Sequence, residues 1–143
     1  KKYGDIPVYA FNFVDYVLWK NREKLKKDYD AKFEDFKFAY RRSIEHWYPQ
    51  NPNGHDGESQ LPAEFLHSFG NLCIITDSQN SRFGNSYPEA KLEQWEREGI
   101  FHRQSLKLQM MAKITSKKNR WDIGEIQSME KEVERYVHDF CDS

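Results

Sequence analysis

Hydrophobic side chains recur at helical spacing near both ends of the chain. Phe11, Val14 and Leu18 lie at positions i, i+3 and i+7, and this pattern predicts a helix over residues 8–26. Towards the other end, Asp122 is followed by a second amphipathic stripe, which consists of Ile126, Met129, Val133, Tyr136, Val137 and Phe140. We expect both stripes to pack in a hydrophobic core.

The middle of the chain predicts two strands and a loop. Residues 40–48 alternate like a strand, and Pro49 should end it because proline removes a ladder donor. Residues 50–62 consist of turn formers and predict a loop. Residues 71–76 form a short apolar strand, whereas residues 28–39 fit either a helical turn or a strand.

Four helices are expected after the second strand. A brief one should run from about residue 77 to 83. Ser86 and Glu89 have the spacing of a capping box for the next, which Gly99 should end. Another should cover residues 104–114, and Asp122 with Glu125 forms the capping-box pattern of the last. The order of elements predicts a mainly helical α+β domain.

Composition and charge fit one folded domain and limit how it can bind nucleic acid. The chain has 143 residues, of which 38% are hydrophobic and 15% aromatic. Its net charge is −1, less basic than is usual for a domain that binds mainly phosphates. Nucleic-acid binding would therefore depend on local basic patches, such as residues 20–42 and 113–120, which could equally be ordinary solvated faces.

The remaining bulk features point to a cytoplasmic setting. Cys73 and Cys141 have no metal-ligand spacing, so we expect reduced thiols. No apolar run approaches the length of a membrane span, and no signal peptide is recognisable. Because the sequence starts at Lys1 without an initiator Met, we expect residues 1–143 to be a single domain that belongs to a longer protein.

Four residues form the candidate chemical site: Glu45, His46, Asn71 and Asn80. Hydrolysis of a phosphodiester needs a base that is neutral near pH 7, which histidine can be, and a hard cation, which prefers oxygen ligands. Glu45 and Asn80 can supply such oxygens, and Asn71 could hydrogen-bond His46 and fix its tautomer. Taken singly, each residue is more often structural or solvated, so the ordered set carries the hypothesis.

Geometry adds a condition to this hypothesis. Neighbouring residues of a regular strand point to opposite faces, so Glu45 and His46 can serve one site only if the strand ends or bulges there.

Three runs of the chain carry a resemblance to a known nuclease family. IEHWYPQ, LHSFGNLCIIT and QNSRFGNSYPEAK resemble the C-terminal nuclease domain of DUF262/DUF1524 proteins, including restriction enzymes of the GmrSD type. The chain is also similar to the HNH domain of the RNA-guided CRISPR nuclease, where two Asn residues lie nine apart, as Asn71 and Asn80 do here. The motif core covers about residues 41–91. Glu45 departs from the Asp of many HNH nucleases, which leaves direct or water-mediated metal contact open.

The resemblance implies a ββα-metal (HNH, His-Me finger) centre flanked by helices and an endonuclease that cuts DNA. His46 would be the general base, Glu45 and Asn80 ligands of Mg²⁺ or Mn²⁺, and Asn71 a supporting residue. The candidate substrate contacts are His67, Arg82, Asn85 and Lys91. His67 could equally be a packed loop histidine, and Lys91 could instead cap or brace the fold. The implied context is restriction or anti-phage defence, together with an N-terminal DUF262-like domain of the same protein or a partner subunit.

Two rival hypotheses remain. The first is an HNH fold that binds nucleic acid or protein without cutting. The second is a helical interaction domain in which the motif match is accidental, and it predicts that His46, Asn71 and Asn80 lie far apart.

Overall fold

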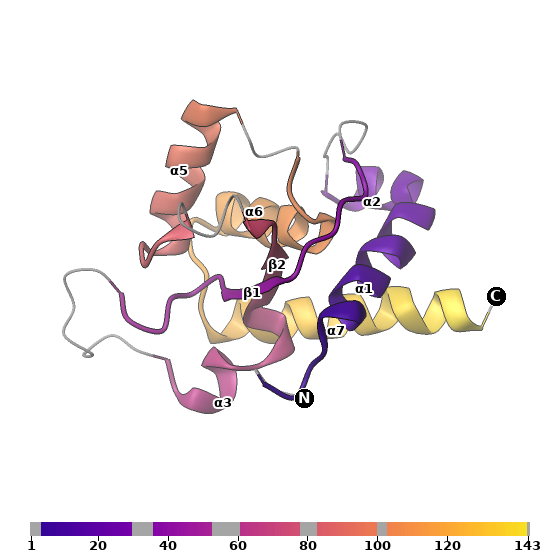
Figure 1. Ribbon diagram of the computed structural model, residues 1–143, viewed down its shortest axis with the longest axis horizontal. Helices are drawn as coiled ribbons and strands as arrows, with labels where there is room; N and C mark the ends of the chain where they lie inside the picture. Colours follow the sequence, from indigo (N-terminus) through magenta and orange to yellow (C-terminus); the bar gives the residue numbers. More distant parts are fainter. Residues whose placement is uncertain (1–3, 30–35, 53–60, 78–82, 100–102, 143) are drawn as a thin grey trace.

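The structure is a computed structural model, which describes residues 4–29, 36–52, 61–77, 83–99 and 103–142. This described part contains six α-helices and a sheet of two antiparallel strands, so the predicted mainly helical α+β class is confirmed (Figure 1). In chain order the elements are α1 (Val8–Lys20), α2 (Arg22–Tyr29), β1 (Ser43–His46), α3 (Ala63–Leu66), the 3-10 helix η1 (Phe69–Asn71), β2 (Leu72–Ile75), α5 (Pro88–Glu98), α6 (Leu106–Lys118) and α7 (Ile123–Cys141).

The single helix predicted over residues 8–26 is divided in two at Asn21. The side-chain amide of Asn21 donates to the carbonyl of Val17 at 2.8 Å, and its backbone N–H is shared between the carbonyls of Val17 and Leu18. Asparagine competes with the helix for backbone hydrogen bonds and therefore favours helix ends. The apolar stripe that the sequence predicts is thus carried by α1, and α2 buries Leu25 separately.

The two predicted strands pair with each other, and the first is shorter than expected. Glu45 lies opposite Cys73 and His46 opposite Leu72 in a regular antiparallel register. β1 covers four residues and ends at His46, before Pro49. All four residues of β2 are buried, as expected for a short apolar run without polar alternation.

Sequence signals at helix ends are largely confirmed. Gly99 closes α5 with a φ of 67°, a left-handed conformation that glycine adopts without strain. Asp122 and Glu125 make both hydrogen bonds of the capping box that starts α7. α6 continues to Lys118, beyond the predicted range 104–114.

Two helix predictions have other outcomes. The capping box predicted at Ser86 is wrong, because the N-cap of α5 is Tyr87 and no side chain caps it. Pro88 in the first turn supplies the start signal instead. The brief helix expected over residues 77–83 falls mainly on residues 78–82, which lie outside the described residues.

The sheet lies at the centre of the molecule, with helices around it (Figure 1). α1 and α6 both pack against β2, and α7 packs against α1, α6 and η1. Segments distant in sequence thereby surround β2, whose partner strand β1 ends at His46. Cys73 is buried on β2 and Cys141 is exposed at the end of α7. None of the described helices has the length and apolar character needed to cross a membrane.

Candidate active site

The sheet fixes the backbone of His46 at the last position of β1. His46 pairs with Leu72, and the next N–H, that of Trp47, donates to the carbonyl of Asn71 at 2.9 Å. Pairing is regular through Glu45 and His46, so the strand has no bulge at these positions and their side chains alternate between its faces. The strand does end at His46. Of the two alternatives that would allow a shared site, a strand end or a bulge, the structure therefore shows the strand end.

The side chain of Asn71 is fully buried and joins three segments of the chain. Its Oδ1 accepts from the backbone N–H of Tyr48 at 2.8 Å and from the indole N–H of Trp121 at 2.9 Å. Its Nδ2 donates to the carbonyls of Tyr48 at 3.1 Å and Leu66 at 2.9 Å. These four bonds fill the capacity of an amide. The side chain thus holds the backbone after His46. The sequence suggests a hydrogen bond to the imidazole of His46, and the structure does not show one.

Lys91, which α5 contributes, lies inside the protein with 1% of its surface exposed. Its ammonium donates to the carbonyls of Trp47 at 2.9 Å and His46 at 3.3 Å. Burial lowers the pKa of Lys91 to about 7, although the charge of Glu45 acts in the opposite direction. This placement favours the bracing role that the sequence left open, because the ammonium is buried and bonded to backbone carbonyls. Any contact of Lys91 with a phosphate stays a prediction.

The imidazoles of His46 and His67 contact each other. His67 directly follows α3, and its Nδ1 lies 2.9 Å from Nε2 of His46, with the two rings at 79°. Burial lowers the pKa of His46 to about 4, and the nearby charges of His67 and Lys91 act in the same direction. His46 is therefore neutral at pH 7, the form that a general base requires. The structure thus brings His67 to the site, whereas its contact with a substrate stays a prediction.

Glu45, which directly precedes His46 in β1, is the described carboxylate among the predicted metal ligands. It is half-buried, and burial raises its pKa while the charge of Lys91 opposes the shift. Its carboxylate makes no hydrogen bond to the described part of the chain, so its oxygens can serve as ligands of a hard cation. The described residues contain no group of three His, Cys, Asp or Glu that could hold a metal ion. Glu45 could therefore supply one carboxylate ligand to Mg²⁺, and the other oxygen ligands would have to come from elsewhere.

Three other predicted site residues, Asn80, Arg82 and Asn85, belong to the segment between β2 and α5. Asn80 and Arg82 lie outside the described residues, so the structure does not place the second expected metal ligand. Asn85 is exposed in the segment before α5. Any contact of Asn85 or Arg82 with a substrate stays a prediction.

Sequence reasoning missed two buried charged residues, of which one bonds to the segment of β2 and the other joins α1 to the start of α6. Lys107 of α6 donates to the carbonyls of Phe69, at 2.9 Å, and Leu72. Asp15 of α1 accepts from the hydroxyl of Ser105 at 2.8 Å and from the N–H of Lys107 at 3.1 Å. Asp15 follows Phe11 by four residues and so lies on the apolar stripe of α1. This spacing was the one sequence signal that could have predicted its burial.

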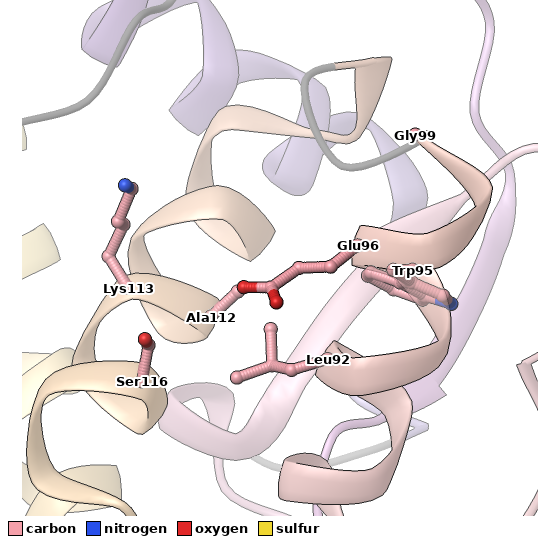
Figure 2. Close-up of a pocket in the computed structure, with 7 residues that line it drawn as sticks. All are labelled: Leu92, Trp95, Glu96, Gly99, Ala112, Lys113 and Ser116. Carbon is pink, nitrogen blue, oxygen red and sulfur yellow. The ribbon is translucent and has the colours of Figure 1, made fainter.

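A pocket of about 300 Å³ lies elsewhere, between α5 and α6 (Figure 2). Figure 2 shows Leu92, Trp95 and Glu96 projecting from α5 and Lys113 and Ser116 from the facing turns of α6. None of the predicted site residues lines this pocket. The candidate chemistry is therefore at the end of β1 and not in this hollow.

Comparison with known proteins identifies the family. Residues 5–133 match the family model described as GmrSD restriction endonucleases, C-terminal domain. No curated protein and no solved structure matches the chain. The matched range includes both strands and the residues His46, His67, Asn71 and Lys91, and the resemblance to the C-terminal domain of GmrSD-type restriction enzymes is confirmed. The chain belongs to the family of C-terminal domains of GmrSD restriction endonucleases.

Proposed function

We propose that this domain is a metal-dependent endonuclease that hydrolyses phosphodiester bonds of DNA in restriction or anti-phage defence. The family is one of restriction endonucleases, which supports a nuclease role in general. The choice of DNA, the metal requirement and the residue roles are our proposal. The partner that we propose is an N-terminal DUF262-like domain, in the same protein or in a separate subunit.

One observation carries this proposal: a neutral, buried imidazole is held at a strand end by bonds to its backbone, and the preceding residue of the strand is a carboxylate that makes no hydrogen bond to the described residues. The backbone of His46 is fixed by β2 on one side and by the ammonium of Lys91 on the other. Rigid placement matters because a base must lie within hydrogen-bond reach of the attacking water. The hypothesis of an accidental match predicts that His46 and Asn71 lie far apart, which disagrees with the 2.9 Å bond from Trp47 to Asn71.

In the proposed reaction, His46 takes a proton from water as the water oxygen attacks phosphorus. The bond from phosphorus to the 3′ oxygen breaks, and the leaving oxygen takes up a proton from solvent water, which yields a 5′-phosphate and a 3′-hydroxyl. Asn71 and Lys91 take no part in the bond changes, and their role is to hold the backbone around His46 in place. A bound Mg²⁺ or Mn²⁺ would supply positive charge for the phosphate and the leaving oxygen. Glu45 and Asn80 are the residues that we propose to hold it.

The test is plasmid cleavage with Mg²⁺ or Mn²⁺ by the wild type, by His46→Ala and by a matched control, His138→Ala. His138 is an exposed histidine on α7 that pairs with Asp142, so its removal should leave cleavage unchanged. We expect His46→Ala to lose at least about a hundredfold in rate, the usual contribution of general-base catalysis. Circular dichroism would verify that each variant is folded.

Each outcome decides between hypotheses. Equal cleavage by the wild type and His46→Ala would exclude His46 as the base. DNA binding without cleavage, by the domain alone and together with its N-terminal partner, would favour the non-cleaving binding module.

A further inference from the structure

Asn71 sets the distance between the two chain segments that carry the histidines. Its Nδ2 donates to the carbonyl of Leu66, directly before His67, and to that of Tyr48, two residues after His46. One buried amide therefore ties both segments together. The result is a separation of 2.9 Å between Nε2 of His46 and Nδ1 of His67, an ordinary hydrogen-bond length.

The backbone around His67 is also fixed from its own side. The N–H of His67 donates to the carbonyl of Ala63 at 3.0 Å and thereby closes the last turn of α3. The hydroxyl of Ser68 donates to the carbonyl of Phe65 at 2.9 Å. The contact between the imidazoles thus joins two segments that are each held by other bonds.

This contact allows two arrangements of the protons. A neutral imidazole has one N–H donor and one lone-pair acceptor. If His46 donates through Nε2, its lone pair lies on Nδ1, and if it accepts at Nε2, its proton lies on Nδ1. Since Nε2 faces His67, only the first arrangement gives His46 a basic lone pair, and that lone pair lies on Nδ1.

We propose that His67 is a positioning residue that accepts the Nε2–H of His46 and keeps the basic lone pair on Nδ1 of His46. The proposal rests on the function above, in which His46 deprotonates water. When Nδ1 of His46 gains that proton, the Nε2–H bond remains, so the imidazolium stays on His46 and His67 stays neutral. A fixed second hydrogen bond of this kind commonly sets the tautomer and ring orientation of functional histidines.

Long-range ¹H–¹⁵N NMR of the wild-type chain tests the proton arrangement without any need for catalysis. His46→Ala assigns the His46 signals. We expect Nε2 of His46 to have the chemical shift of a protonated nitrogen and Nδ1 that of an unprotonated one. In His67→Leu, which has no acceptor, we expect the His46 signals to shift towards a mixture of tautomers. His67→Asn, whose side-chain amide oxygen can lie near the position of the lost Nδ1, should restore the wild-type pattern.

Cleavage kinetics then test the consequence for the reaction. We expect His67→Leu to lower kcat about tenfold or more with little change in KM, and His67→Asn to recover most of the loss. A protonated Nδ1 on His46 in the wild type would overturn the proposal, as would identical His46 spectra in the wild type and His67→Leu. Equal kcat losses in His67→Leu and His67→Asn would also overturn it. If the wild type does not cut DNA, the proposed function fails, and the spectra alone decide the role of His67.

Discussion

The indole N–H of Trp121 donates to Oδ1 of Asn71 at 2.9 Å, across 50 positions of sequence. Trp121 lies just before the capping box of α7, and Asn71 lies just before β2. The bond therefore couples the start of the last helix to the strand pair that carries His46. Both partners are buried, with exposures of 2% for Trp121 and 0% for Asn71, so neither can exchange the bond for one to water.

Replacement of Asn71 by Ala should destabilise the fold by at least about 3 kcal/mol. The change leaves buried donors and acceptors of Tyr48, Leu66 and Trp121 without partners, and each such group costs about 1–3 kcal/mol. Urea unfolding would measure the loss. The matched control is Asn85→Ala, because Asn85 is exposed and its loss should change stability by less than about 0.5 kcal/mol. Similar stabilities for the two variants would contradict the structural role of Asn71.

Glycines provide a second matched pair. A Cβ at Gly70 would lie 2.1 Å from the carbonyl oxygen of Ile126, in the backbone of α7, so Gly70→Ala should cost about 2–3 kcal/mol. A Cβ at Gly124 meets nothing within 4 Å, and Gly124→Ala should stabilise α7 by about 0.5 kcal/mol. Thermal unfolding of both variants would show opposite shifts in Tm. A stable Gly70→Ala protein would mean that α7 packs less closely on η1 than described.

Lys91 should make stability depend on pH. Its pKa is about 7 in the folded protein, against the ordinary lysine value of 10.5, so between these limits the unfolded chain binds a proton that the folded chain has released. Stability contributed by this group should therefore rise with pH from about 7, by up to about 1.4 kcal/mol per pH unit. Urea unfolding at pH 7 and pH 8 would detect the rise, since Lys107, with a folded pKa of about 8, contributes mainly at higher pH.

Lys91→Met should remove this rise, whereas Lys117→Met should retain it. Lys117 is an exposed lysine on α6 and so serves as the control. An unchanged pH slope in Lys91→Met would show that the ammonium of Lys91 is solvated and not bonded to the carbonyls of His46 and Trp47.

Glu45→Gln should raise the Mg²⁺ concentration needed for half-maximal cleavage by about tenfold or more. The amide keeps one oxygen but loses the negative charge that attracts a hard cation. Cleavage rates over a Mg²⁺ titration would measure the change, with Glu93→Gln on the exposed face of α5 as the control. EDTA should abolish cleavage by every variant. An unchanged Mg²⁺ requirement in Glu45→Gln would remove Glu45 from the proposed ligands.

Local signals predicted much of the fold. The capping box at Asp122, the end of α5 at Gly99 and the apolar run of β2 depend on residues close in sequence, and all are confirmed. The motif also predicted that His46 and Asn71 lie together. The burial of Lys107 could not be predicted, because lysine is seldom buried and its partners here are backbone carbonyls 35 and 38 positions away.

The hydrogen bonds of Asn71 have a consequence for the order of events during synthesis. Trp121 and α7 are made long after His46, and until they leave the ribosome the Oδ1 of Asn71 has no indole to bind. η1, directly before β2, also lacks its packing partner until α7 is present. We therefore expect a nascent chain to acquire its reactive geometry only when nearly all of the domain has been translated. For the DNA endonuclease that we propose, such late assembly would keep incomplete chains inactive inside the cell that makes them.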